Sequence, residues 1–213
     1  MLTVHHLGRS QSERVVWLCE ELGLSYDLIR YARDPVTILA PPELKALHPL
    51  GSAPLISDGG PALAESGAIV EYILAKYGAG KLAVTPDEPE FADYLDWFHF
   101  ANGTLQLAMS RCFYLRRLDP PPDNPVLAAA EGRLERAFRY VDERLGAVPY
   151  FAGQVFTAAD IMMVFSLTTM RLFVPVALAP YPAVRAYLQR IGSRDGYRRA
   201  MEKGNPGVPP MLT

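Results

Sequence analysis

The chain has 213 residues, of which 50% are apolar and 21% charged, and its formal net charge is −2. This is the composition of a globular protein that can bury a hydrophobic core, either as one large domain or as two small ones. Acidic and basic residues are interspersed, so we expect no nucleic-acid partner. No apolar run approaches the ~18 residues of a membrane span, so we expect no membrane partner.

The N-terminus and the cysteines indicate the compartment. Residues 1–11 contain neither the basic nor the apolar segment of a secretory signal. Cys19 and Cys112 are the two cysteines, and neither has Cys or His neighbours at a metal-binding spacing. We therefore expect a cytoplasmic protein with two reduced thiols, no metal site and no cofactor.

Residues 1–78 alternate between strand and helix patterns. LTVHH is a strand candidate, SERVVWLCEELGL is an amphipathic helix, and YDLIR and PPELKALHP are a second strand and a short helix. APLIS, the turn DGG and PALA predict a hairpin, and a helix follows it. The predicted order is β-α-β-α-β-β-α, a mixed sheet with helices to cover it.

The remainder of the chain carries helical patterns only. Residues 79–88 have no periodicity and are interpreted as a linker, and residues 89–213 are predicted to form an all-helical domain. Asn124 with Pro125 marks one helix start, and Thr157 with Asp160 predicts an acidic capping box at another. The expected fold is an α/β domain followed by an all-α domain.

The start of the first helix offers a hydroxyl beside a helix N-terminus. Ser10 and Glu13 have the S-x-x-E spacing of a capping box, which by itself explains Ser10. A helix N-terminus also presents unpaired N–H groups and a partial positive charge, which stabilise an anion such as a thiolate. Both roles remain open from the residues alone.

Two further places could hold a ligand. Pro54 precedes a strand, and a cis bond there would turn the backbone groups of Ala53 away from the sheet toward a peptide-like ligand. Glu65 and Ser66 stand directly before a helix, where they could cap it. A carboxylate and a hydroxyl at a helix start could equally bind the ammonium and the carboxylate of an amino-acid head group.

Four stretches together resemble the cytosolic glutathione transferase superfamily, and the likeness extends over essentially the full chain. They are SERVVWLCEELGLSYDL, HPLGSAPLI, ALAESGAIVEYIL and YFAGQVFTAADI. The resemblance implies a thioredoxin-like first domain that binds glutathione and a helical second domain that contributes a pocket for an electrophile. It also implies a homodimer, a role in detoxification, and glutathione as substrate.

The resemblance assigns roles position by position. Pro54 matches the family's cis-proline, and Ala53 then provides backbone hydrogen bonds to the cysteinyl part of glutathione. Glu65 and Ser66 match the pair that binds its γ-glutamyl end. Many relatives carry lysine or glutamine where Ser52 stands, so the contact with the glycine carboxylate falls to Ser52 itself or to a substitute such as His48 or Arg9.

The residue that activates the thiol is assigned by elimination. Family members use a tyrosine, serine or cysteine near the first helix; no tyrosine precedes Tyr26, and Cys19 lies in mid-helix. The chain therefore resembles the serine type of bacteria and fungi, and Ser10 is preferred over Ser12 as the catalytic residue.

The predicted function is conjugation of the glutathione thiolate to a small electrophile. Two alternatives stay open: a glutathione-binding module without catalysis, and reduction of peroxides by the same thiolate. Trp97, Phe98, Met109 and Tyr114 form an apolar stripe in the helical domain, which is more typical of a core than of a substrate pocket.

Overall fold

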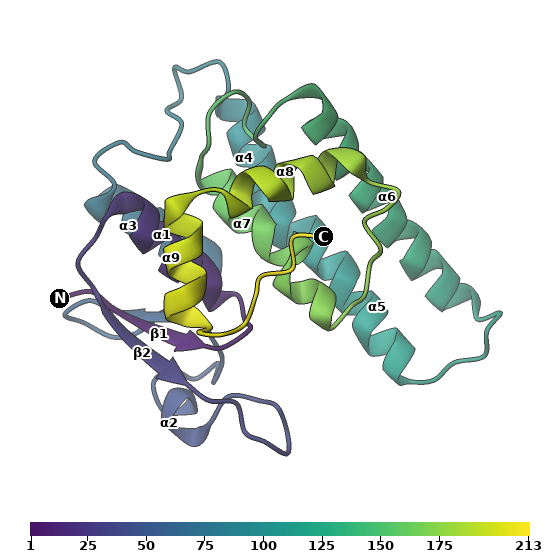
Figure 1. Ribbon diagram of the computed structural model, residues 1–213. Helices are drawn as coiled ribbons and strands as arrows, with labels where there is room; N and C mark the ends of the chain where they lie inside the picture. Colours follow the sequence, from purple (N-terminus) through teal and green to yellow (C-terminus); the bar gives the residue numbers. More distant parts are fainter. The chain divides into compact units, whose positions relative to one another are not determined.

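A computed structural model describes residues 1–213. By internal contacts the chain divides into two units. Residues 1–83 and 192–210 form the first, and residues 84–191 and 211–213 form the second. The predicted linker, 79–88, spans the point where the chain passes from one unit to the other (Figure 1).

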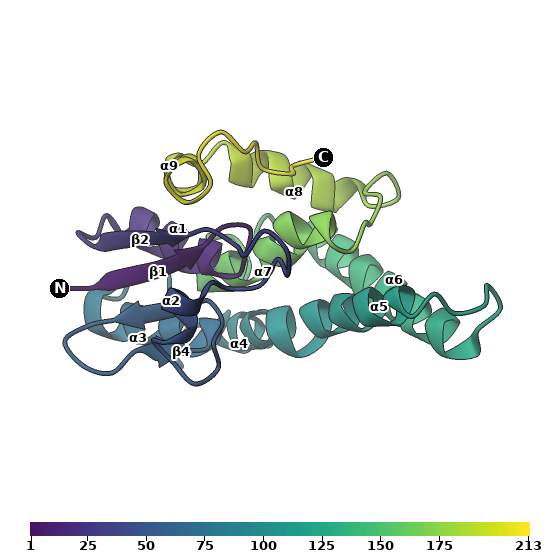
Figure 2. The ribbon, with the colours of Figure 1, turned by 90° about the horizontal axis from the view of Figure 1, so that it is seen from below.

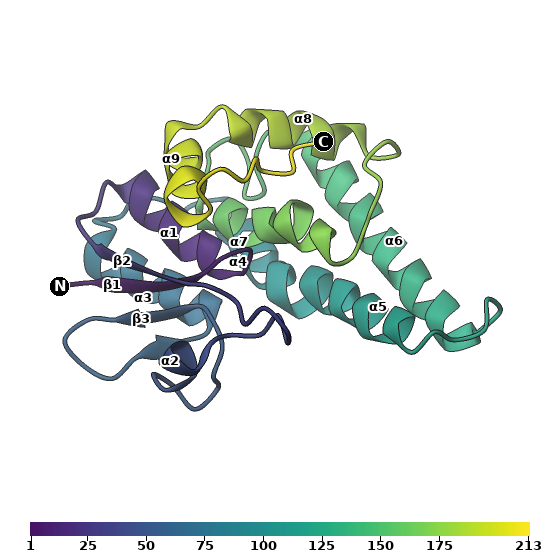
Figure 3. The same ribbon diagram turned by 60° about the horizontal axis from the view of Figure 1, so that its bottom comes forward.

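The first unit contains a four-stranded mixed sheet. Its strands lie in the order β2-β1-β3-β4, with β1 and β2 parallel and the other pairs antiparallel; β1, β2 and β3 can be followed side by side in Figure 3. The β-α-β-α-β-β-α order predicted from the sequence is confirmed. The elements are β1 (Thr3–Leu7), α1 (Ser12–Leu22), β2 (Asp27–Tyr31), α2 (Pro42–Lys45), β3 (Leu55–Ser57), β4 (Leu63–Ala64) and α3 (Ser66–Tyr77).

Helices cover both faces of β1. Side chains along a strand alternate between its faces, so neighbouring residues of β1 pack against different elements. Leu7 packs with Leu44 of α2 and Leu55 of β3 on one face. His6 points to the other face, where its ring meets Ser12 of α1. Val4, His5, His6 and Leu7 are all buried, so β1 is the centre of the unit.

A helix from the C-terminal part of the chain completes the first unit. Helix α9 (Asp195–Gly204) packs along α1, as Figure 2 shows. Tyr197 meets the Trp17 indole edge-to-face with ring centroids 5.0 Å apart. Glu20 of α1 pairs with Arg199 at 3.0 Å and with Lys203 at 2.5 Å. The apolar side of this amphipathic helix is thus buried against α1.

The second unit consists of helices, as the sequence predicts. None of its helices, and none in the first unit, has the length and apolar character needed to span a membrane. The elements are α4 (Phe91–Phe100), a π-helical segment (Ala101–Gln106), α5 (Leu107–Arg117), α6 (Pro125–Ala147), α7 (Ala158–Leu167), a 3-10 segment (Thr169–Leu172) and α8 (Pro182–Gly192).

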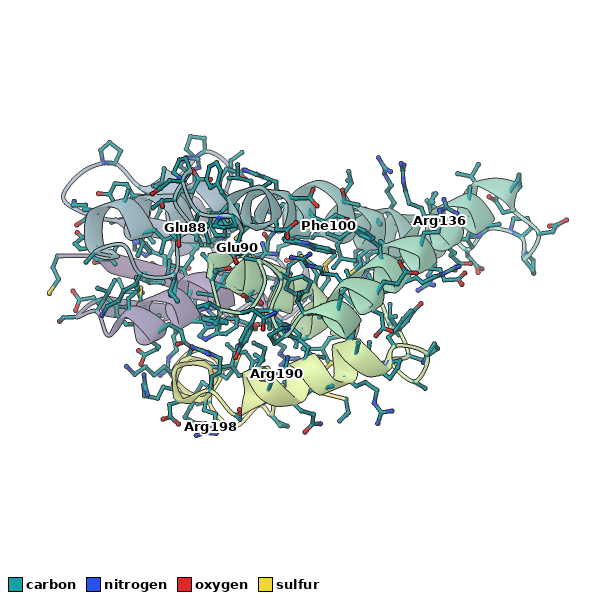
Figure 4. All side chains as sticks on the ribbon, turned by 90° about the horizontal axis from the view of Figure 1, so that it is seen from above. Glu88, Glu90, Phe100, Arg136, Arg190 and Arg198 are labelled. Atoms are coloured by element: carbon teal, nitrogen blue, oxygen red, sulfur yellow. The ribbon has the colours of Figure 1, made fainter.

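Aromatic side chains form the core of the second unit. The Trp97 indole stacks on Tyr140 with centroids 4.9 Å apart and meets Phe151 at 5.0 Å. Phe100, labelled in Figure 4, contacts both Trp97 and Tyr140. Trp97, Phe98 and Met109 are therefore core residues, whereas the fourth residue of the predicted stripe, Tyr114, is 67% exposed.

Two predicted helix caps are present in the second unit. The Asn124 carboxamide accepts hydrogen bonds from the N–H groups of Val126 and Leu127 at the start of α6. Thr157 and Asp160 form the reciprocal capping box of α7. These bonds satisfy backbone N–H groups that the first helical turn leaves without a partner.

Asp160 also connects α7 to its surroundings. Its carboxylate accepts from Thr157 N at 2.9 Å, Phe151 N at 3.1 Å and Tyr187 Oη at 3.0 Å, and the residue is fully buried. Burial raises the pKa of this carboxyl to about 6, although the hydrogen bonds it accepts oppose the rise. With the longer bond from Thr157 Oγ1 at 3.5 Å, four buried donors depend on this one side chain.

Asp160→Ala should lower the free energy of unfolding by about 3–5 kcal/mol, because it leaves these donors without an acceptor in the interior. Asp160→Asn, which keeps one carbonyl oxygen, should cost less. Arg139→Ala removes an exposed ion pair with Glu135 and should leave stability nearly unchanged. Urea denaturation of the three variants tests this, and equal losses in all three would contradict it.

Candidate functional site

Ser12 closes the turn that joins β1 to α1. Its Oγ accepts from the Leu7 N–H at 3.1 Å and lies 3.2 Å from the Leu7 carbonyl oxygen. The same Oγ is 2.8 Å from His6 Nδ1. Ser12 is completely buried, so its hydroxyl belongs to the framework of the turn.

Ser10 lies on the outer side of the same turn and is partly exposed. Its Oγ accepts from the Ser12 N–H at 3.2 Å and is 2.7 Å from Ser12 Oγ. The predicted Ser10–Glu13 capping box is wrong: α1 begins at Ser12 with Gln11 as its N-cap, and the Gln11 side chain forms no capping bond. The bond to the Glu13 N–H comes from the Ser10 backbone carbonyl, at 3.1 Å.

A residue from the far end of the chain explains why the box does not form. The Asn205 amide donates to the Glu13 carboxylate at 3.0 Å, and its Oδ1 accepts from the Arg9 N–H at 2.9 Å. Asn205 directly follows α9, so the packing of α9 on α1 brings it to this turn. Sequence reasoning did not single out Asn205, because no local pattern connects it to residues 9–13.

The N-termini of α1 and α3 meet through a buried arginine. Arg14 Nη1 donates to Gln11 Oε1 at 2.8 Å and to Ser66 Oγ at 3.0 Å, and Ser66 Oγ donates to Gln11 Oε1 at 3.2 Å. Arg14 is 1% exposed, and burial lowers the pKa of its guanidinium to about 9. This contact brings the turn that carries Ser10 together with the Glu65–Ser66 pair.

Glu65 is the N-cap of α3, with a backbone conformation rare for residues other than glycine. Its φ is 71°, and its side chain forms no hydrogen bond to cap the helix. Strained backbone of this kind is found most often at functional sites. The Glu65 carboxylate is exposed, while Ser66, the first residue of α3, is 2% exposed.

The Ala53–Pro54 peptide bond is cis, and it borders the same end of the sheet. The antiparallel register pairs His5 with Leu55, so its continuation places Ala53 opposite Leu7, where the Ser10 turn begins. Leu55 also pairs with Ala64, so the Glu65–Ser66 pair continues from the other side of the same strand. Ala53 forms no backbone hydrogen bond of its own.

The remaining predicted residues lie in the loop before β3. Ser52 is exposed, and His48 is partly buried. The Leu50 N–H donates to His48 Nδ1 at 3.2 Å, and the Gly51 N–H donates to the His48 carbonyl at 2.9 Å. His48 thus shapes this turn, and no hydrogen bond connects either residue to Ser10.

Neither cysteine offers a reactive thiolate. Cys19 and Cys112 are both completely buried. Burial raises the pKa of the Cys19 thiol to about 12, and it also raises the pKa of Cys112. The chain's own cysteines are therefore not candidates for a reactive group at this site.

Comparison with known proteins agrees with this two-part architecture. Residues 9–76 match the family model "Glutathione S-transferase, N-terminal domain", and residues 104–195 match "Glutathione S-transferase, C-terminal domain". Glutathione S-transferase 3 of Schizosaccharomyces pombe is 31% identical over 217 residues, covering 95% of this chain and 88% of the relative.

Two further relatives extend the comparison. The crystal structure of a glutathione S-transferase from Actinobacillus pleuropneumoniae aligns with a TM-score of 0.88 at 30% identity, covering 96% of this chain and 93% of that one. A disulfide-bond oxidoreductase of Escherichia coli is 26% identical over 97% of both chains. The two family models and the relatives at about 30% identity define the class of the protein, the glutathione transferases. The chain belongs to the cytosolic glutathione transferase superfamily, as a transferase.

His6 makes the stability of the fold depend on pH. Burial lowers its pKa to about 4 and outweighs the effects of the neighbouring Asn205, Gly204 and Arg30. Below the unfolded value of ~6.5 the unfolded chain takes up a proton that folded His6 does not, so acidification favours unfolding until the pH reaches the folded pKa.

The His6→Asn variant should therefore lose less stability on acidification than the wild type. The difference in the free energy of unfolding between variant and wild type should change by up to about 3 kcal/mol from pH 7 to pH 4, at 1.36 kcal/mol per pKa unit. Denaturant titrations across this range measure it. The same substitution at the exposed His99 is the control, and parallel curves for His6→Asn and wild type would contradict the assignment.

Proposed function

We propose that the protein conjugates the thiol of glutathione to a small electrophile, and that the Ser10 hydroxyl donates a hydrogen bond to the thiolate. The observation that carries this proposal is the contrast between the two candidate serines. Ser10 is partly exposed at the N-terminus of α1, whereas Ser12 is completely buried and bonded within the turn. Only Ser10 has a hydroxyl that a bound sulfur can approach.

The energetic demand matches what the site provides. A free thiol has a pKa of ~8.5, and lowering it by ~2 units takes ~2.7 kcal/mol of preferential stabilisation of the anion. One hydrogen bond to a charged group contributes ~1.5–3 kcal/mol, and a helix N-terminus adds ~0.3–1 kcal/mol. The first N–H groups of α1 already donate to Ser10 and Gln11, so the helix acts on the sulfur through its dipole. Together these effects are sufficient without a general base.

The rest of glutathione binds along the same end of the sheet. The exposed Glu65 carboxylate receives the γ-glutamyl ammonium, and the uncapped N–H groups at the start of α3 receive the carboxylate. The Ser66 hydroxyl is held by Arg14 and Gln11, so its part is to fix the helix start. The Ala53 backbone pairs with the cysteinyl unit, and Ser52 or His48 lies nearest the glycine end.

Ser10→Ala should lower kcat for conjugation by about 10- to 100-fold, the factor that corresponds to one hydrogen bond to a charged group. KM for glutathione should change little, because this bond forms with the thiolate. Ser25→Ala, an exposed serine in the same unit, is the matched control. Thiolate absorbance of bound glutathione against pH gives the second readout, and a Ser10→Ala complex that titrates like wild type would rule Ser10 out.

Glu65→Gln should weaken glutathione binding by about 10-fold, because the amide keeps the size of the side chain but removes the charge opposite the ammonium. Glu71→Gln, an exposed glutamate on the same helix, should bind glutathione like wild type. Isothermal titration calorimetry compares the three proteins. Equal affinities would move the γ-glutamyl subsite away from Glu65.

Two alternatives to conjugation, a binding module without catalysis and a peroxidase, can be distinguished by the same assays. A binding module would hold glutathione with an unshifted thiol pKa, and a peroxidase would reduce peroxides through the same thiolate. The oxidoreductase among the relatives makes glutathione-dependent redox chemistry the second candidate. The burial of Cys19 and Cys112 favours a route through the thiol of glutathione over one through the chain's own cysteines. Conjugation and peroxide reduction measured side by side distinguish them.

The family also supplies expectations for the whole molecule. We expect a cytoplasmic homodimer that acts in detoxification, as is typical of this superfamily. Sedimentation velocity tests the dimer.

A further inference from the structure

We propose that His6 and Ser12 are positioning residues that turn the hydroxyl proton of Ser10 outward, toward the sulfur of bound glutathione. This inference rests on the proposed role of Ser10. It adds that the direction of the Ser10 hydroxyl is set from inside the protein, by a chain of hydrogen bonds that ends at a buried imidazole.

The chain runs from the interior to the site in two short steps. His6 Nδ1 is 2.8 Å from Ser12 Oγ, and Ser12 Oγ is 2.7 Å from Ser10 Oγ. Two backbone N–H groups join it: that of Leu7 donates to Ser12 Oγ at 3.1 Å, and that of Ser12 donates to Ser10 Oγ at 3.2 Å. Each serine oxygen therefore already accepts one bond from the backbone.

The number of protons and lone pairs limits how the chain can be arranged. A hydroxyl donates one proton and accepts two hydrogen bonds. If His6 carries its proton on Nδ1, that proton fills the second lone pair of Ser12 Oγ, and the Ser12 proton has to go elsewhere. Ser10 Oγ at 2.7 Å is a closer acceptor than the Leu7 carbonyl at 3.2 Å. Both lone pairs of Ser10 are then occupied, and its own proton points away from the chain.

The other tautomer reverses the two side-chain bonds, whereas the backbone N–H groups still donate. With its proton on Nε2, His6 would accept the Ser12 proton at Nδ1. Ser12 would in turn accept the Ser10 proton, and Ser10 would present a lone pair to the sulfur. A lone pair repels a thiolate, so the tautomer of His6 decides whether Ser10 assists.

The surroundings of Nε2 favour the productive tautomer. This nitrogen is buried and has no hydrogen-bond partner, although Gly204 lies close to it. Asn205 is on the same side; its Oδ1 accepts from Arg9, its Nδ2 donates to Glu13, and neither atom forms a hydrogen bond with Nε2. A proton on Nε2 would be an orphaned buried donor, which folded proteins rarely tolerate, whereas a proton on Nδ1 has an acceptor at 2.8 Å.

His6 also stays in one protonation state at the pH of the reaction. Burial keeps its pKa at about 4, so the ring carries a single proton near neutral pH. It therefore acts as a fixed element that orients Ser10 and takes no part as an acid or base.

The first test titrates the thiol of bound glutathione by its thiolate absorbance in wild type, His6→Leu, His6→Asn and Ser10→Ala. His6→Leu should raise the bound thiol pKa by about 0.5–1 unit, part of the total expected from Ser10. The dissociation constant of S-methylglutathione should stay unchanged. His6→Asn should restore the wild-type titration, because its amide nitrogen can occupy the position of Nδ1.

The outcomes separate this inference from the proposed function. If Ser10→Ala loses the shift while His6→Leu titrates like wild type, Ser10 remains the activating residue and the positioning role is overturned. If wild type itself shows no shift, or Ser10→Ala keeps it, the proposed function and this inference both fail. A rise in His6→Leu that His6→Asn does not correct also overturns it, since the effect is then one of packing.

A second measurement does not depend on any variant folding. Long-range ¹H–¹⁵N correlation spectra of the ¹⁵N-labelled wild-type protein report the tautomer of each of the 4 histidines. The ring of His6, identified through its backbone connections, should carry its proton on Nδ1 at pH 7. A proton on Nε2 would overturn the inference.

Discussion

The turn between β1 and α1 is the constraint on which the site depends. One buried hydroxyl, that of Ser12, contacts both backbone groups of Leu7 and so fixes where the strand ends and how the helix starts. Ser10 is held outside this turn, and Gln11 is brought to the contact with Arg14 and Ser66. Because Ser12 is bonded within the turn, Ser10 is the serine that the turn leaves partly exposed.

Residues remote in sequence hold this turn from outside. The pairs of Glu20 with Arg199 and Lys203 anchor α9 on α1, and Asn205 then reaches Arg9 and Glu13. Arg199 and Lys203 are half exposed, so each ion pair contributes little to the free energy of packing α9 on α1. The buried side of α9 contributes most of it. The final segment of the chain thus stabilises a turn made by the first.

Sequence reasoning predicted the strand and helix order, the caps at Asn124 and Thr157, and the core role of Trp97, because each depends on local periodicity or spacing. It failed at the start of α1, where the S-x-x-E spacing suggested a capping box. Asn205 competes for Glu13 there, and a contact between residues so far apart leaves no local pattern. The same holds for Arg14 and His6, whose partners come from other elements.

The helix N-termini of this protein differ in whether the N-cap side chain bonds to the first N–H groups. Helices α6 and α7 begin with Asn124 and Thr157, whose side chains satisfy the first N–H groups. The N-cap residues of α1 and α3 form no such side-chain bond, and neither do those of α4 and α9, so this absence alone does not mark a site. What distinguishes α1 and α3 is that the buried Arg14 joins their ends, beside the partly exposed Ser10 and the exposed Glu65. Two helix N-termini and a buried cation then favour anions at a single place, as the proposed binding of a thiolate and a carboxylate of one peptide would require.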